Sequence, residues 1–244
     1  MIKHEEQLAQ EAVRWIRRNA NKKVVIEQFA SLERYQPTQH PLVFFTAGSP
    51  GAGKTEFIKG FRESIERSLK IKLAILDPDK VRELLPSYTG SNSYVFQRAI
   101  SIAVDDLFRH VLKHKQSAFV DGTLSDYDRA KSNLEKAIDH YGQVTIFYVF
   151  QHPAIAWHFT QLREVVEGRN IKKNDFIEKF LGAKEVVDKL KAAFGDKLVL
   201  NIILKDYKDT KENKAVASAI EDVSRIEDHL DFSYTKSSLE RILH

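Results

Sequence analysis

A glycine-rich segment at residues 48–55 carries the strongest chemical signal in the sequence. Glycines let successive backbone N–H groups point inward around a phosphate, in dihedral angles that other residues avoid. An ordinary glycine-rich turn before a helix could look similar. The flanking segments also fit, however, because an apolar run precedes the segment and an amphipathic helix follows it. All eight positions match the P-loop pattern GxxxxGK[ST], since the segment reads Gly48, Ser49, Pro50, Gly51, Ala52, Gly53, Lys54, Thr55.

The last two residues of this loop predict which part of a nucleotide is bound. We expect the Lys54 ammonium to reach the β- and γ-phosphates and the Thr55 hydroxyl to hold Mg²⁺. A helix that begins at Lys54 would add the positive end of its dipole. The sequence therefore predicts binding of a nucleoside triphosphate, ATP or GTP, together with Mg²⁺.

Two acidic groups follow apolar runs that are typical of strands. Asp77 and Asp79 come directly after residues 71–76, and Asp121 comes directly after residues 117–120. Ligands of open parallel sheets bind outside the carboxyl ends of the strands. We therefore expect these carboxylates to lie near the P-loop.

The two acids at 77 and 79 favour different interpretations. Asp77 precedes Pro78 and suits the N-cap of a helix. Asp79 could likewise serve only the positive end of that helix. Its predicted place beside the P-loop favours a catalytic base that orients an acceptor hydroxyl, the role that kinases give to an aspartate.

Asp121 is the second acidic candidate. A charge at the end of a buried strand is costly without a partner, and an acid in this setting often manages Mg²⁺. We therefore predict that Asp121 is a metal ligand together with Thr55. Thr123, two residues further on, is a candidate for the same site.

Basic residues near position 165 could close over the phosphates. Arg163 and Arg169 flank Gly168, and Lys172 and Lys173 follow. Arginine forks match the charge that develops on a transferring phosphoryl group, and a helix followed by a basic loop could act as a lid near residues 160–182. The same residues could instead be ordinary cations at a helix C-terminus that Gly168 caps.

The elements that must position these residues alternate between strands and helices. Apolar runs separated by amphipathic helices indicate a parallel sheet that is covered on both faces. We therefore predict an α/β, three-layer fold with a five-stranded, mostly parallel sheet. The expected strands are 42–47, 71–76, 117–120, 144–150 and 198–204, and the helices between them are about 55–69, 93–114, 126–140, 153–166, 174–181 and 183–194.

Helical segments are expected to flank this core. Residues 2–20 carry apolar side chains at helical spacing, and a second helix should follow at about 22–34. We divide the chain into an N-terminal helical extension at 1–40, a core at 41–205 and a C-terminal helical segment at 206–244. The extension could shield the nucleotide site or simply add a layer to the core.

Composition limits the remaining classes of protein. The 244 residues suit one domain of generous size, and the absence of cysteine fits a reducing cytoplasm. A formal net charge of +4 is too small to indicate nucleic acid as a partner. Because no apolar run approaches transmembrane length, we expect a cytoplasmic protein without a membrane partner.

The ordered set of motifs resembles the zeta toxins, P-loop kinases of bacterial toxin–antitoxin systems. The likeness extends from residue 42 to about residue 180. It implies a P-loop kinase-like fold with sheet order 2-3-1-4-5, and an antitoxin protein as a possible partner. The resemblance rests on the loop at 47–55, Asp77-Pro78-Asp79, Asp121-Gly122-Thr123, and Arg163 with Arg169 ahead of Ile171-Lys172-Lys173.

The resemblance also implies an activity. Zeta toxins use ATP to phosphorylate the 3′-hydroxyl of the amino sugar in UDP-N-acetylglucosamine, so the chain would be a phosphotransferase with an alcohol group as acceptor. Asp79 would be the base, and Arg163 and Arg169 would join Lys54 in clamping the phosphates. The nucleotide sugar would meet Asp79, Asp105, Asp121 and Thr123, with Asp121 also near Mg²⁺.

Two departures from the family pattern concern the acceptor. Better-known members have Glu in place of Asp121 and a basic residue in place of Ser125. A nucleoside or polynucleotide kinase uses the same P-loop and stays an alternative, although it would want a clearer basic groove. A nucleotide-dependent switch protein is a third hypothesis, against which the lack of an Asn-Lys-x-Asp motif counts.

Overall fold

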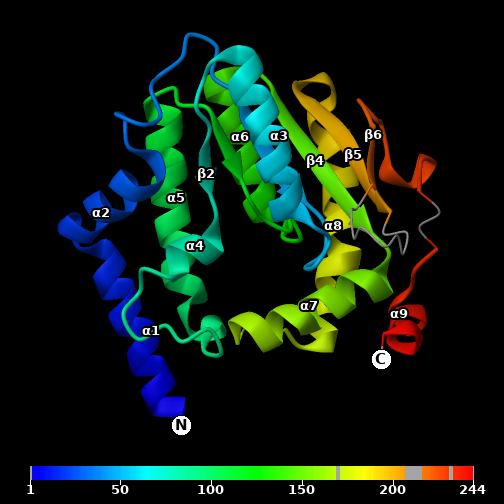
Figure 1. Cartoon of the computed structure of the whole chain (residues 1–244), viewed down its shortest axis with the longest axis horizontal. Helices are drawn as coiled ribbons and strands as arrows, with labels where there is room; N and C mark the ends of the chain where they lie inside the picture. The colour runs from blue at the N-terminus through cyan, green and yellow to red at the C-terminus, as the bar shows by residue number, and fades with distance from the viewer. Residues whose placement is uncertain (1, 169–170, 207–215, 231–232, 244) are drawn as a thin grey trace.

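One sheet organises the chain (Figure 1). The structure is a computed structural model that describes residues 2–168, 171–206, 216–230 and 233–243. Its strands pair in the order β2-β3-β1-β4-β5-β6. Their bounds are β1 (Val43–Ala47), β2 (Ala74–Leu76), β3 (Ala118–Val120), β4 (Val144–Gln151), β5 (Leu198–Asp206) and β6 (Val216–Ile220).

The first five strands confirm the predicted order. β1 lies at the centre and pairs in parallel with β3 and β4, while β2 and β5 extend the sheet on either side. The expectation of five strands is short by one. β6 pairs antiparallel with β5, with Ile202 opposite Ile220, so the segment after residue 205 is not purely helical.

Helices cover both faces of the sheet, as the alternation of apolar strands and helices predicted. Phe44 and Phe119 point to one face and pack against α3, whereas Phe45 points to the other face and packs against Phe108 of α5. α6 and α8 cover that second face as well. The helices are α1 (Ile2–Arg17), α2 (Asn19–Ala30), α3 (Lys54–Leu69), α4 (Pro78–Arg82), α5 (Gln97–Lys113), α6 (Tyr127–Tyr141), α7 (Pro153–Glu167), α8 (Lys173–Phe194) and α9 (Lys236–Ile242).

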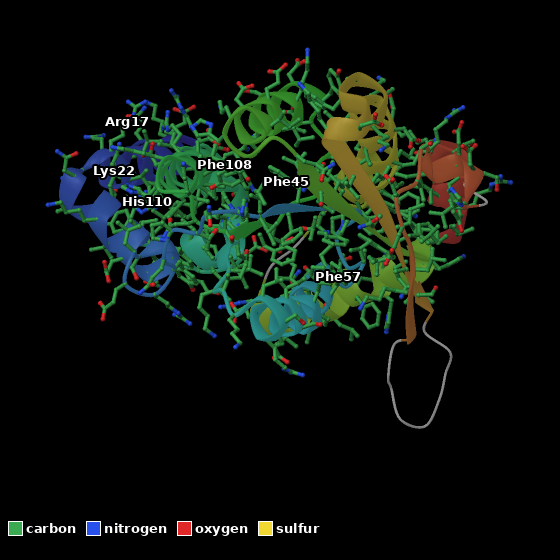
Figure 2. All side chains as sticks on the ribbon, turned by 90° about the horizontal axis from the view of Figure 1, so that it is seen from above. Arg17, Lys22, Phe45, Phe57, Phe108 and His110 are labelled. Carbon is green, nitrogen blue, oxygen red and sulfur yellow. The ribbon has the colours of Figure 1, made fainter. Side chains whose placement is uncertain are left out.

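The N-terminal helices form a further layer outside α5. Ile16 of α1 and Val25 of α2 are buried in the core that α5 shares. Gln116, just after α5, donates from Nε2 to the carbonyl oxygens of Ala30 at 2.9 Å and Tyr35 at 2.6 Å. In Figure 2, Lys22 of α2 lies beyond α5, on the side of the molecule away from Phe57 of α3. The extension therefore packs as an added layer.

Residues 173–194 differ from the sequence expectation, because they form the single helix α8 where two helices were predicted. Gly182 lies inside it, and a Cβ atom there would lie 3.4 Å from the Ser125 carbonyl oxygen. α8 therefore continues through this glycine and packs there on the loop after β3. α9 packs on the start of α8, where Lys173 donates to the carbonyl oxygen of Glu240 at 2.9 Å. Among the helices that the structure describes, none has the length and apolar character needed to cross a membrane.

Candidate active site

The P-loop connects β1 to α3, and its backbone requires glycine at specific positions. Gly48 has φ +126° and Gly51 has φ +72°. A Cβ atom at Gly48 would lie 2.2 Å from the carbonyl oxygen of Val149, and one at Gly51 would lie 2.0 Å from that of Ala156. Both the dihedral angles and the close approach to β4 and α7 therefore exclude larger residues.

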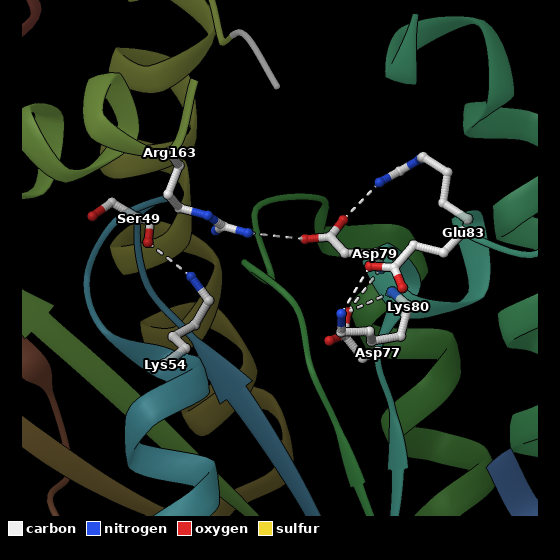
Figure 3. A network of polar contacts seen from close by, with 8 residues as sticks. Ser49, Lys54, Asp77, Asp79, Lys80, Glu83 and Arg163 are labelled. Atoms are coloured by element: carbon white, nitrogen blue, oxygen red, sulfur yellow. Dashed lines mark hydrogen bonds and ion pairs between the residues drawn. The ribbon is translucent and has the colours of Figure 1, made fainter. Parts of the chain in front are cut away.

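Lys54 begins α3 and turns back into the loop. Its Nζ donates to the carbonyl oxygen of Gly48 at 3.0 Å. It also donates to that of Ser49 at 2.7 Å, the bond drawn in Figure 3. Burial lowers the pKa of Lys54 to about 8, although the negative charges of Asp121 and Asp79 act in the opposite direction. The P-loop lysine therefore lies among the acids that follow β2 and β3.

Asp77 has the structural role that its sequence predicted. Its Oδ1 accepts from the backbone N–H groups of Asp79 at 2.8 Å and Lys80 at 3.4 Å, which confirms it as the N-cap of α4. Burial, together with the charges of Asp79 and Asp121, raises the pKa of Asp77 to about 6. The carboxylates that follow β2 and β3 are thus close enough to repel one another.

Asp79 lies between two arginines. Arg82 donates from Nη1 to Asp79 Oδ1 at 2.6 Å, and Nη2 of Arg163 lies 3.9 Å from Asp79 Oδ2. Arg163 comes from α7, on the P-loop side of the site, whereas Asp79 belongs to α4 (Figure 3). An ion pair therefore joins the two sides of the space above Lys54.

Asp121 is fixed by a residue inside β1. Thr46 donates from Oγ1 to Asp121 Oδ1 at 2.6 Å, and the same Oγ1 accepts from the N–H of Gly122 at 3.2 Å. Burial raises the pKa of Asp121, more than the nearby Lys54 charge lowers it. A partly buried carboxylate whose pKa is raised in this way would be stabilised in its charged form by a nearby cation.

The residues predicted for Mg²⁺ are compatible with it. Thr55 lies on the exposed first turn of α3, and Asp121 offers a partly buried carboxylate at the same edge of the sheet. Mg²⁺ prefers oxygen ligands and is commonly held by one or two protein groups together with phosphates and water. In the part of the chain that the structure describes, no group of three or more histidine or acidic residues could hold a metal by itself. Thr55 and Asp121 therefore suit a metal that arrives with a nucleotide.

Of the remaining predicted site residues, one lies beside the P-loop, one lies on a helix away from it, and one is not among the residues that the structure describes. Thr123 is next to the P-loop, because its carbonyl oxygen accepts from the N–H of Gly48 at 3.2 Å. Asp105 lies on α5 and pairs with Arg129 of α6 at 3.4 Å. Arg169 lies outside the residues that the structure describes.

α7 lies over the P-loop, and its second half overlaps the segment near residues 160–182 that was predicted as a lid. Its Ala156 and Thr160 contact Gly51, and its end at Gly168 approaches the loop at residues 89–91. Arg163 lies between these two points. α7 therefore spans the site from the P-loop to the chain that follows α4. A cavity of 370 Å³ lies on α7, lined by Trp157, Thr160, Gln161, Glu164, Ile171, Lys172 and Lys173.

Several polar residues of the site were not predicted. Thr46 looks like an ordinary strand residue, and Arg82 looks like a surface cation at the end of a short helix. Lys179 of α8 also lies close enough to lower the pKa of Lys54. The one available signal was the spacing of Arg82, since a cation three residues after an acid on a helix can pair with it.

Comparison with known proteins assigns the chain to a family. A family model described as Zeta toxin matches residues 26–217. The chain belongs to the zeta toxin family. No curated protein matches this zeta toxin family member.

Solved structures share its fold at low sequence identity. A structure from the PezAT chromosomal toxin–antitoxin system of Streptococcus pneumoniae matches with TM-score 0.59 and 15% identity, over 93% of this chain and 88% of that one. A chain of the AvrRxo1-ORF1:-ORF2 complex with ATP matches with TM-score 0.60 and 14% identity, over 98% of this chain and 80% of that one. This zeta toxin family member therefore has a P-loop kinase-like fold, and the family and fold support a phosphotransferase.

Proposed function

We propose that this zeta toxin family member is a kinase that transfers the γ-phosphate of ATP to a sugar hydroxyl. The proposed acceptor is the 3′-hydroxyl of UDP-N-acetylglucosamine or a similar nucleotide sugar. The observation that carries the proposal is the ion pair of Arg163 with Asp79 above Lys54. It brings a phosphate-binding cation and a potential base to one space, which a site for nucleotide binding alone would not require.

The P-loop side of the site would hold ATP. Lys54 would exchange the carbonyl oxygens of Gly48 and Ser49 for phosphate oxygens, and Arg163 would move from Asp79 to the γ-phosphate. Both cations would oppose the charge that develops on the transferring group. The Thr55 hydroxyl and the Asp121 carboxylate would hold Mg²⁺, whose charge offsets that of the phosphates.

Asp79 would act on the acceptor. Its carboxylate would accept a hydrogen bond from the sugar hydroxyl, align the oxygen with the γ-phosphorus, and take the proton as the new O–P bond forms. The bond between the γ-phosphorus and its bridging oxygen breaks, and ADP leaves with the electron pair. Thr123, beside the P-loop, and Asp105 of α5, which pairs with Arg129 of α6, would contact the rest of the acceptor.

The similar structures also support proposals for the phosphate donor, the protein partner and the location of the protein. One similar structure comes from a toxin–antitoxin system and another holds ATP. We therefore infer ATP as the phosphate donor, an antitoxin protein as a partner, and a cytoplasmic location in which the nucleotide sugar is available.

A panel of acceptors tests the proposal directly. Purified protein is incubated with γ-labelled ATP and Mg²⁺, and with UDP-N-acetylglucosamine, a nucleoside, a 5′-hydroxyl oligonucleotide or no acceptor. We expect label on UDP-N-acetylglucosamine at the 3′-position by mass spectrometry and NMR, and none with Lys54→Ala. Label on the oligonucleotide or nucleoside instead would replace the proposed acceptor. Absence of transfer to every acceptor, with ATP still bound, would favour a switch protein.

A further inference from the structure

We propose that Arg82 is a positioning residue that holds the Asp79 carboxylate in the orientation needed for phosphoryl transfer. This inference rests on the proposed function, because it assigns a role through the proposed base. It adds a buried side chain that does not itself need to touch either substrate.

The geometry of α4 explains why Asp79 needs such support. Asp79 is the second residue of a five-residue helix, and its side chain is 33% exposed. A carboxylate in that setting has several accessible rotamers. Arg82 lies one turn further along the same helix and is only 3% exposed, so its guanidinium is held by the surrounding core. The bond from Nη1 to Asp79 Oδ1 at 2.6 Å therefore ties a partly exposed carboxylate to a buried anchor.

The hydrogen bonding of Arg82 indicates that this contact is its principal polar role. Among the described residues, Asp79 is the one hydrogen-bond partner of the Arg82 side chain, and the buried Nε atom of that side chain has none. A buried cation without its counter-ion is strongly destabilising, whereas a buried pair is a poor source of stability. An apolar residue of similar size would thus fill the same space without the electrostatic cost. The pair is better explained by the orientation that it imposes on Asp79.

The two arginines that face Asp79 have different contacts. Arg163 lies on another helix, is 43% exposed and approaches Asp79 Oδ2 only to 3.9 Å. Its longer contact and its exposure make it the arginine that we expect to move to an incoming phosphate. Arg82 holds the opposite oxygen from inside the core, so Asp79 keeps its orientation when Arg163 moves. Oδ2, the oxygen that faces Arg163, is then the one that accepts from the acceptor hydroxyl.

The same helix provides a matched control. Lys80 pairs with Glu83 at 2.8 Å with the same three-residue spacing, but both side chains are more than half exposed. Loss of that pair removes an ion pair of α4 without touching Asp79. Glu83→Gln therefore reports what the loss of a surface pair on this helix costs.

A double-mutant cycle tests the proposal. Transfer from ATP to UDP-N-acetylglucosamine, and ATP hydrolysis with water as acceptor, are measured for wild type, Arg82→Met, Asp79→Asn and the double variant. We expect Arg82→Met to lower kcat by about 10²-fold, the scale of a misplaced catalytic group, with an unchanged Kd for ATP. Arg82→Lys, which keeps the charge but loses the fork, should recover part of the rate. Glu83→Gln should behave as wild type.

The cycle separates the two proposals. In the Asp79→Asn background, Arg82→Met should change kcat by no more than about 2-fold, because residues that act as a unit are not additive. An equal loss in both backgrounds, or a normal kcat in Arg82→Met, would overturn the positioning role and leave the base intact. Normal transfer by Asp79→Asn would overturn the base and the positioning role together. If Arg82→Met does not fold, as judged by thermal unfolding, Arg82→Lys takes its place in the cycle.

Discussion

Lys54 is a residue whose charge depends on its surroundings. Burial lowers its pKa from the usual value of 10.5 to about 8, so the free protein loses the ammonium as the pH rises through about 8. Binding of the ATP phosphates depends on that ammonium. We therefore expect the Kd for ATP to rise with pH above 8, by up to about tenfold per unit, in calorimetric titrations between pH 7 and pH 9.5. Lys54→Arg, whose charge does not titrate in this range, should remove the slope. A wild-type Kd that stays constant over this range would contradict the prediction.

Substitution of Asp79 distinguishes a role in catalysis from a role in stabilising α4. Asp79→Asn keeps the size of the side chain and removes its charge. Because the base would be lost, we expect phosphoryl transfer to fall by about 10²-fold or more. ATP binding should persist, because Lys54 and the P-loop backbone are unchanged. Steady-state kinetics and thermal unfolding check both points, and normal transfer with a lowered Tm would assign Asp79 to α4 alone.

The packing of α7 on the P-loop makes a prediction at the scale of elements. A Cβ atom at Gly51 would lie 2.0 Å from the Ala156 carbonyl oxygen, on backbone with positive φ. Gly51→Ala must therefore displace α7 or the loop, and we expect it to lower the free energy of unfolding by about 1–3 kcal/mol and to weaken ATP binding. Chemical denaturation and calorimetry measure the two effects.

A second glycine provides the control for that change. Gly60 lies inside α3, where a Cβ atom would meet nothing within 4 Å. Gly60→Ala should raise the free energy of unfolding by about 0.5–1 kcal/mol, because alanine is favoured in a helix. If Gly51→Ala and Gly60→Ala changed the free energy of unfolding and ATP binding equally, the close contact between α7 and the P-loop would contribute neither to stability nor to binding.

The elements also show what can be predicted from sequence and what cannot. The P-loop and the cap at Asp77 were predictable because their residue types encode local backbone geometry. β6 was not, since Val216–Ile220 is a short run with two alanines and a serine, and its pairing with β5 is a tertiary contact. Arg82 was missed because its spacing also suits a solvated cation, and only packing reveals that it is buried. At Gly182 the error was the opposite one, because the low helix propensity of glycine predicted a break where α8 continues and packs on Ser125.

At the scale of the whole molecule, the N-terminal helices stabilise the fold from outside the sheet. Ile16 is 1% exposed within the core shared with α5. Ile16→Ala should therefore lower the free energy of unfolding by about 2–5 kcal/mol, with kcat unchanged below the unfolding transition. Val24, which is 52% exposed on α2, provides a control, and Val24→Ala should be nearly neutral. A folded Ile16→Ala protein with faster ATP turnover would instead indicate that the extension restrains the site.

The sheet order has a consequence for the time at which the site is completed during protein synthesis. β1, which carries the P-loop, pairs with β3 and β4, so its two neighbours emerge from the ribosome well after it does. α7, which supplies Arg163, follows β4. Chains fold as domains, and contacts between distant segments form late. A nascent chain that ends before α7 therefore has Lys54 and Asp79 but lacks Arg163, the cation that pairs with Asp79. Under the proposed mechanism, such a chain would not transfer phosphate while it is still being made.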